Sequence, residues 1–178
     1  SKSVLPMLRR YSLAIVAVVV ATFASARAPQ ISADPIRWTG WMGPHRNGWV
    51  SHFKPPQMWP KELHKQWQVD VGTGYSSPLV VDGYVYQFAR QGEEEVVWCL
   101  DINSGNVRWR KAYDVPFKMG GGGEWHGKGP KSSPVFSDGR IFTFSITGLL
   151  TAWDATSGEQ LWQRDYGSRF KLSHPYWG

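Results

Sequence analysis

The sequence predicts an all-β fold, a β-propeller of four-stranded antiparallel blades, and three observations predict it. Residues 76–88 and 132–144 share a pattern that begins Ser-Ser-Pro and contains an Asp-Gly pair. Residues 101–109 and 154–162 share a second pattern, Asp-x-x-Ser-Gly-x-x-x-Trp. The chain also contains 19 Gly, 12 Pro and 11 Trp, a composition typical of short strands joined by tight turns. A four-stranded unit repeated about every 40 to 55 residues indicates a propeller blade.

Each copy of the repeat divides into four strands. In the first copy we expect strands at residues 78–81, 84–90, 96–100 and 106–113. The Asp82-Gly83 pair between the first two strands favours a two-residue turn with positive φ, which matches the twist of paired strands. The segment from Asp101 to Gly105 supplies a side-chain acceptor for turn amides and a glycine for a left-handed position.

Tryptophans recur at one position in the last strand of each copy, four residues after the turn glycine. A Trp side chain buries on the order of 200 Å², which is an upper estimate of about 5 kcal/mol, so rings at one register can wedge adjacent sheets together. Trp67 precedes the first Ser-Ser-Pro as Trp109 precedes the second, and so marks the last strand of a preceding, incomplete blade. The structural repeat residues are Asp101, Gly105, Trp109, Asp154, Gly158 and Trp162.

The Asp-x-x-Ser/Thr-Gly-x-x-x-Trp corner resembles the tryptophan-docking motif of pyrroloquinoline-quinone-like (PQQ-like) repeat propellers. That group includes quinoprotein alcohol dehydrogenases and BamB-like outer-membrane assembly factors. The upstream segment from Trp38 to Gly48 is similar to the Trp-rich leader of secreted propellers of this kind. The resemblance covers about residues 38–178 and implies a propeller of seven or eight blades, so we expect this chain to be an N-terminal fragment with about two complete blades.

The first 28 residues have the pattern of a secretory signal peptide. Arg9-Arg10 precedes a short apolar run, and small residues follow it up to Ala28, whereas a membrane-spanning helix needs about 20 apolar residues. An uncleaved anchor helix is the alternative. We therefore expect residues 1–28 to be a signal peptide, 29–63 a Trp/Gly/Pro-rich leader, and 64–178 a partial propeller with blades at about 76–113 and 133–166. The expected location is the periplasm or the exterior, with no stable membrane span after cleavage.

The charge of the chain gives little support to a nucleic-acid partner. The formal net charge is +6, but four basic residues and no acidic ones lie within the predicted signal peptide. The remainder is close to neutral, unlike a nucleic-acid interface. The single cysteine, Cys99, excludes an intrachain disulfide and is expected to be a small buried apolar residue.

Two insertions in the predicted blades fall on the same face of the propeller. One is the loop at residues 91–95, and the other connects the blades at residues 114–131. Elaborated loops on a rigid scaffold are common binding sites, so the candidate ligand face comprises Arg90, Trp125, His126 and Lys128. A platform of Trp125 with Lys128 and Arg90 would suit sugars or quinones. A hydrogen-bonded loop histidine is the alternative for His126, and a solvated hairpin tip is the alternative for a calcium site at the three glutamates 93–95.

Two functions fit these features. A binding or scaffold module needs only a rigid disk and elaborated loops, with a protein or saccharide as the ligand. The N-terminal part of a PQQ-dependent oxidoreductase would need a cofactor clamp, calcium and a catalytic Asp, and the resemblance implies adjacent cysteines that Cys99 does not supply. We predict no catalytic residue, no metal site and no cofactor in this chain; PQQ with calcium would belong only to the full-length protein. Missing blades or a partner are expected to close the propeller.

Overall fold

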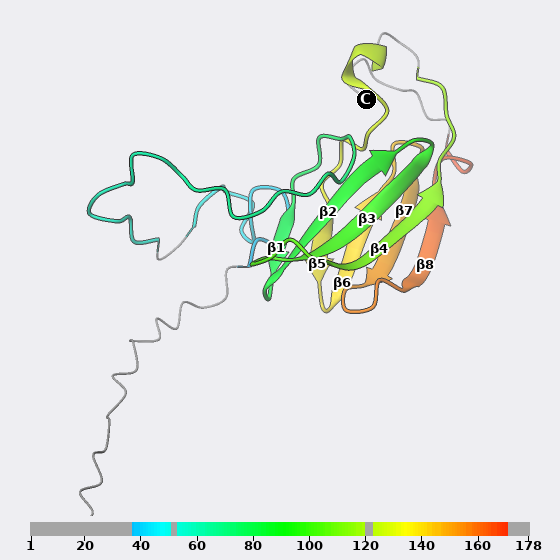
Figure 1. The fold of residues 1–178 in the computed structure, drawn as a ribbon. Coiled ribbons are helices and arrows are strands. Elements are labelled where there is room, and N and C mark those ends of the chain that lie inside the picture. Colours follow the sequence, from blue (N-terminus) through cyan, green and yellow to red (C-terminus); the bar gives the residue numbers. More distant parts are fainter. Residues whose placement is uncertain (1–36, 51–52, 120–122, 171–178) are drawn as a thin grey trace, which may run out of the picture. The chain divides into compact units, whose positions relative to one another are not determined.

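The computed structural model describes residues 37–50, 53–119 and 123–170, and the predicted signal peptide lies outside these ranges. Eight strands form two four-stranded antiparallel sheets, each in the order of the chain (Figure 1). The first sheet contains β1 (Leu79–Val81), β2 (Tyr84–Gln91), β3 (Glu94–Asp101) and β4 (Val107–Asp114). The second contains β5 (Val135–Ser137), β6 (Arg140–Phe144), β7 (Leu149–Asp154) and β8 (Gln160–Asp165). The all-β prediction with two propeller-type blades is confirmed.

The turns of the two sheets repeat one another as the sequence predicts. The β1–β2 turn has φ of 50° at Asp82 and 85° at Gly83, and the β5–β6 turn has φ of 49° at Asp138 and 72° at Gly139. Positive φ at both central residues is the geometry that Asp-Gly favours in two-residue hairpins. The repetition extends to a register shift at Cys99/Leu100 in one sheet and at Ala152/Trp153 in the other. The two copies therefore share their turn geometry and the place of a strand irregularity, as well as their sequence motifs.

The carboxylates of the two structural aspartates close the β3–β4 and β7–β8 turns. Asp154 Oδ1 accepts hydrogen bonds from the Ser157 amide at 2.8 Å and the Thr156 amide at 3.0 Å. Asp101 holds the equivalent turn through the Ser104 side chain and amide. These hydrogen bonds favour the ionised form, so they lower the pKa of both carboxyl groups. Both aspartates therefore act as side-chain acceptors within their turns.

The two sheets pack face to face over one apolar core. The first sheet contributes Phe88, Val97 and Trp109, and the second contributes Ile141 and Trp153, all of them buried. Trp109 Nε1 donates a hydrogen bond to the Ala155 carbonyl at 3.0 Å, so the ring is fixed by a polar contact as well as by burial. On its other face the first sheet is covered by residues 67–71, and there Trp67 Nε1 donates to the Ile102 carbonyl at 2.8 Å. Trp67 and Trp109 thus make equivalent contacts with two successive turns.

Glycines 105 and 158 are required where the tryptophan rings lie against the turns. Gly158 has φ of 71°, and a Cβ added there would lie 2.6 Å from the Trp109 ring. Gly105 has the same φ, and its added Cβ would lie 2.7 Å from the Trp67 ring. The glycine in this motif therefore serves both the left-handed backbone and the close approach of the indole.

We expect Gly158→Ala to destabilise the protein more than Gly83→Ala. Both positions have positive φ, which costs about 1–2 kcal/mol for alanine. Nothing lies within 4 Å of a Cβ at Gly83, whereas at Gly158 the Trp109 ring must also move. Urea denaturation of the two variants measures the difference, and equal losses would mean that the indole contact contributes nothing.

Candidate functional site

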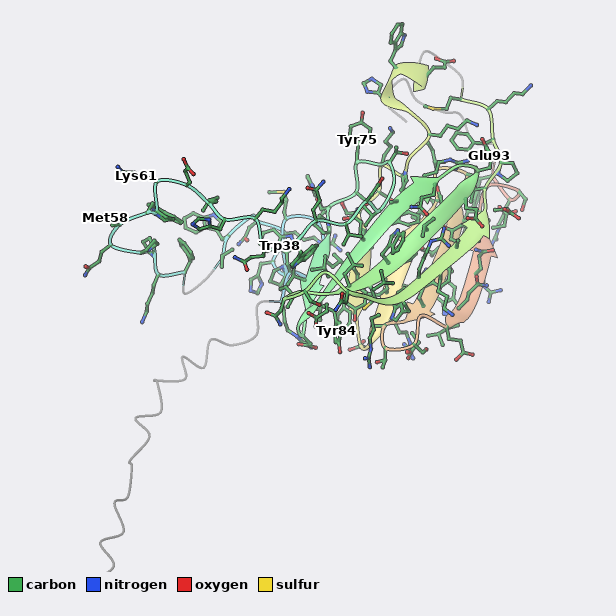
Figure 2. All side chains as sticks on the ribbon, viewed as in Figure 1. Trp38, Met58, Lys61, Tyr75, Tyr84 and Glu93 are labelled. Atoms are coloured by element: carbon green, nitrogen blue, oxygen red, sulfur yellow. The ribbon has the colours of Figure 1, made fainter. Side chains whose placement is uncertain are left out.

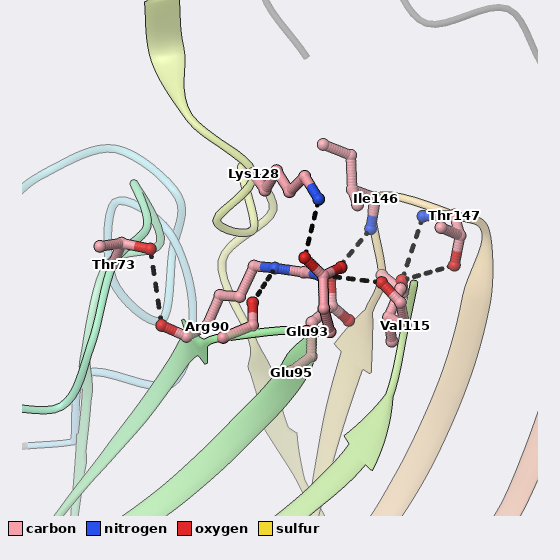
Figure 3. Close-up of polar contacts among 10 residues, drawn as sticks. Thr73, Arg90, Glu93, Glu95, Val115, Lys128, Ile146 and Thr147 are labelled. Atoms are coloured by element: carbon pink, nitrogen blue, oxygen red, sulfur yellow. Dashed lines mark hydrogen bonds and ion pairs between the residues drawn. The ribbon is translucent and has the colours of Figure 1, made fainter. Parts of the chain in front are cut away.

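The site lies at the end of the sheets that carries the β2–β3 turn and the long β4–β5 connection, and we call it the loop end. The turn consists of Gly92 and Glu93, and the connection runs from residue 115 to residue 134. The Val115 amide donates to the Glu93 carbonyl at 2.9 Å, so the two segments lie side by side (Figure 3). The two elaborated loops therefore lie at the same end of the sheets.

Arg90 joins the turn to the long connection from inside the protein. Its side chain is 2% exposed. Nε donates to the Gly92 carbonyl, while Nη2 donates to the Val115 carbonyl and pairs with Glu93 at 2.8 Å. Nη1 is buried and has no hydrogen-bond partner within the described residues. Arg90 therefore positions the loops and does not offer its guanidinium to solvent, contrary to its expected place in an exposed platform.

Phe117 is the ring that faces the cations at the loop end. The Arg90 Cζ lies 5.0 Å from its centroid, and the Lys128 Nζ lies 5.6 Å from it. Lys128 also pairs with Glu93 at 2.9 Å, and this hydrogen bond is the main cause that lowers the pKa of Glu93. One carboxylate thus links both cations. The aromatic ring beside these cations is therefore that of Phe117 and not that of Trp125. No repeat or spacing in the sequence indicates this role for Phe117.

A second anchor holds the far end of the long connection. Lys131 Nζ lies 4.1 Å from the Tyr75 ring centroid and donates to the His126 carbonyl at 2.8 Å. The rings of Tyr75 and His126 meet edge to face at 6.5 Å, and the Tyr75 amide donates to the Pro130 carbonyl. Partial burial lowers the pKa of Lys131. The His126 ring therefore contacts an aromatic ring, and its carbonyl accepts a hydrogen bond from Lys131.

Trp125 projects from between the two anchors. It belongs to the short 3₁₀ helix η1 (Gly123–His126) and is 91% exposed. Beside this helix is a shallow hollow, lined by Lys118, Met119, Glu124, Gly127 and Lys128. The loop end therefore combines one exposed indole, two lysines and a glutamate on a connection that is anchored on both sides. Such a surface can stack against a ring and bind an anionic or hydroxyl group.

Glu95 differs from the solvated hairpin tip that the sequence suggests. It lies within β3, is fully buried, and faces the second sheet. Its Oε2 accepts a hydrogen bond from the Tyr113 hydroxyl at 2.8 Å. Its Oε1 accepts one from the Ile146 amide at 3.3 Å (Figure 3). Burial raises the pKa of Glu95. The prediction fails because β3 begins at Glu94, two residues earlier than expected, so alternation turns Glu95 inward.

The described residues offer no set of donors that fits a quinone–calcium pair. Within residues 37–50, 53–119 and 123–170, no group of three His, Cys, Asp or Glu side chains converges as metal ligands. Cys99 is buried, as predicted, and burial raises the pKa of its thiol to about 11. No chemistry of such a cofactor follows from these residues. The structure also describes no helix long and apolar enough to cross a bilayer.

Comparisons with known proteins agree with the repeat. Residues 93–175 match a family model described as outer membrane protein assembly factor BamB. A 1-butanol dehydrogenase (cytochrome c) of Thauera butanivorans is 31% identical over 113 residues, which are 59% of this chain and 15% of the relative. The quinohemoprotein alcohol dehydrogenase ADH-IIG of Pseudomonas putida is 27% identical and is also covered over 15% of its length. The chain thus spans less than a fifth of these relatives.

Among solved structures, BamB from Moraxella catarrhalis is similar over 56% of this chain and 26% of its own, with 22% identity and a TM-score of 0.39. A europium-containing methanol dehydrogenase is similar over 49% of this chain and 15% of its own, with 22% identity and a TM-score of 0.35. The family model and the sequence relatives, together with the repeated four-stranded sheets, confirm that this chain resembles the PQQ-like repeat β-propeller proteins of the BamB and quinoprotein dehydrogenase type.

Proposed function

We propose that the chain is part of a periplasmic or secreted propeller that acts as a binding module, with the loop end as its ligand face. The observation that carries the proposal is Trp125, a 91% exposed indole on a connection that is anchored at both ends. An exposed Trp that is held by a rigid support can bind a ligand with little loss of conformational freedom. The anchors at Arg90 and Lys131 supply that support without using the indole.

The ligand that suits this face is a saccharide or an extended protein segment. Trp125 offers a flat apolar surface for stacking, and Lys118 and Lys128 border the adjacent hollow. Glu124 in the same hollow supplies an acceptor for hydroxyl or amide groups. The module would be translocated by the signal peptide at residues 1–28, followed by the leader at 29–63 and the propeller from residue 64.

Titration of the full-length protein with oligosaccharides and with extended peptides tests this proposal. Trp125→Ala should weaken binding by at least about tenfold, because buried tryptophans dominate such interfaces. Trp49→Ala is the matched control, since Trp49 is also highly exposed but lies in the leader. Equal affinities for the two variants, or no binding by the unaltered protein, would contradict a ligand face at the loop end.

A quinoprotein oxidoreductase is the second candidate function, and the names of the two curated relatives favour it. Its cofactor residues would lie outside the described part of this chain. Adding PQQ and calcium to the full-length protein and measuring alcohol-dependent dye reduction separates the two functions. Clear turnover that persists in Trp125→Ala would support the oxidoreductase and count against a pure binding module.

A further inference from the structure

A second exposed surface lies far from the loop end, on the leader. Residues 53–65 leave the sheets as a protruding segment with Met58 and Lys61 near its outer end (Figures 1 and 2). Among the described residues, no backbone hydrogen bond joins residues 53–63 to either sheet. Its large apolar side chains are exposed: Phe53, Met58, Trp59 and Leu63. Met58 and Leu63 are each 85% exposed, so this segment presents large apolar side chains to solvent.

The chain pairs with the first sheet both before and after the protruding segment. On the N-terminal side, Trp38 pairs with Val80 through two backbone hydrogen bonds. On the C-terminal side, the Trp67 indole donates to Ile102, and Thr73 pairs with Arg90. Within the segment, the Phe53 and Trp59 rings stack at 6.4 Å, and three prolines (55, 56 and 60) restrict the backbone. The ring stacking and the prolines therefore restrict the segment, and its apolar side chains remain exposed.

The charge of residues 37–65 differs in sign from that of the blades. Residues 37–65 contain five basic residues and one acidic residue, a net charge of +4. Residues 66–170 contain ten basic and twelve acidic residues, a net charge of −2. In the protruding segment, Lys54, Lys61 and Lys65 are interspersed with the exposed apolar residues, and Glu62 is the single acid. Positive charge and exposed aromatic rings thus occur on the same surface.

We propose that residues 53–65 form a peripheral membrane-contact site that inserts Met58, Trp59 and Leu63 into the interface of a bilayer containing anionic lipid. Trp is favoured at the boundary between headgroups and acyl chains, where its ring is apolar and its N–H is polar. Lysines can extend their charge to the headgroups while their methylene stems stay in contact with apolar surface. Attraction between each lysine and an anionic surface strengthens binding about fivefold. This site is separate from the ligand face at Trp125.

The experiment uses the full-length protein and vesicles of phosphatidylcholine with or without phosphatidylglycerol. We expect sedimentation with the anionic vesicles and about fivefold weaker partition for Lys61→Gln. The double variant Met58→Ser/Trp59→Ser should lower partition by about tenfold or more, because apolar insertion is lost. Trp125→Ala should bind vesicles as the unaltered protein does. Equal partition of the double variant and the unaltered protein would overturn the proposal, and so would the absence of vesicle binding.

A fluorescent label distinguishes insertion from other occupants of this surface. Cys99 is the sole cysteine and is buried, so Leu63→Cys and Trp125→Cys can each be labelled at the new thiol. Vesicles should shift the emission of the label at position 63 to shorter wavelength and leave the label at position 125 unchanged. A label at position 63 that is already shielded from soluble quencher without lipid would overturn the proposal, because another part of the protein would then cover the segment. Displacement from vesicles by a short single-stranded oligonucleotide that itself shifts the label would favour a nucleic-acid site instead.

Discussion

Trp109→Ala should lower the free energy of unfolding by about 3–5 kcal/mol, the range for removing a large aromatic side chain from a core. Trp109 is buried between the two sheets, packs against Tyr86 and Gly158, and donates to the Ala155 carbonyl. Its loss leaves a cavity where the sheets meet and removes one of the two donors to the Ala155 carbonyl, the other being the Tyr86 hydroxyl at 3.3 Å. Urea denaturation of the full-length protein measures the change, with Trp125→Ala as a control that should cost little.

The same substitution at Trp162 measures the contribution of the equivalent side chain on the outer face of the second sheet. Trp162 is equivalent to Trp109 in the repeat, but it is 39% exposed and contacts Phe142 at 6.0 Å. If a further sheet covers this face in the full-length protein, Trp162→Ala should cost as much as Trp109→Ala. A cost of about 1 kcal/mol or less would mean that the face stays open, in conflict with the expectation that missing blades or a partner close the propeller.

Glu95→Ala should lower the free energy of unfolding by about 2–4 kcal/mol. The carboxylate accepts hydrogen bonds from the Tyr113 hydroxyl and the Ile146 amide between the two sheets. Without it, both partly buried donors lose their acceptor, at about 1–3 kcal/mol each before relaxation. Denaturation at neutral pH measures this loss. A loss within error of zero would mean that water replaces the carboxylate without cost.

Glu95→Gln isolates the pH dependence of the same group. Because burial raises the folded-state pKa of Glu95 above its unfolded value, the folded state binds the proton more strongly. The stability of the unaltered protein relative to Glu95→Gln should therefore rise as pH falls through the folded pKa toward the unfolded one. Asp101 and Asp154 change the stability with pH in the opposite direction, since their pKa values are lowered. The unaltered protein and the Glu95→Gln variant both contain these two residues, so their effect cancels in the difference. A relative stability that falls with decreasing pH would show that the pKa of Glu95 is lowered.

The repeat made most of the fold predictable from the sequence. Asp-Gly pairs favour positive φ, and the Asp-x-x-Ser-Gly corners close their turns with contacts between near neighbours, so both could be assigned without tertiary information. The equivalence of Trp67 and Trp109 was also visible from their spacing. Each of these features rests on interactions within a few residues or on a pattern that occurs twice.

The loop end could be placed from the sequence, but its contacts could not. Strand alternation and blade topology put Arg90, Trp125, His126 and Lys128 at one end. Whether a long basic side chain points to solvent or into the protein depends on the residues of the other sheet and of the long connection that lie beside it. Phe117 is the clearest example, because it lies 5.0 Å from Arg90 although 27 positions separate them.

By itself, the sequence determined the repeats, the turns, and the recurring tryptophans and turn glycines, whereas the contact between a tryptophan and the glycine of the next turn was visible only in the structure. Only the tertiary structure decided that Arg90 and Glu95 lie buried, that Phe117 and not Trp125 faces the cations, and that residues 53–65 protrude. The physical reason is the range of the interactions. Turn geometry and periodicity are local, whereas burial of a charge depends on donors and acceptors that distant segments supply.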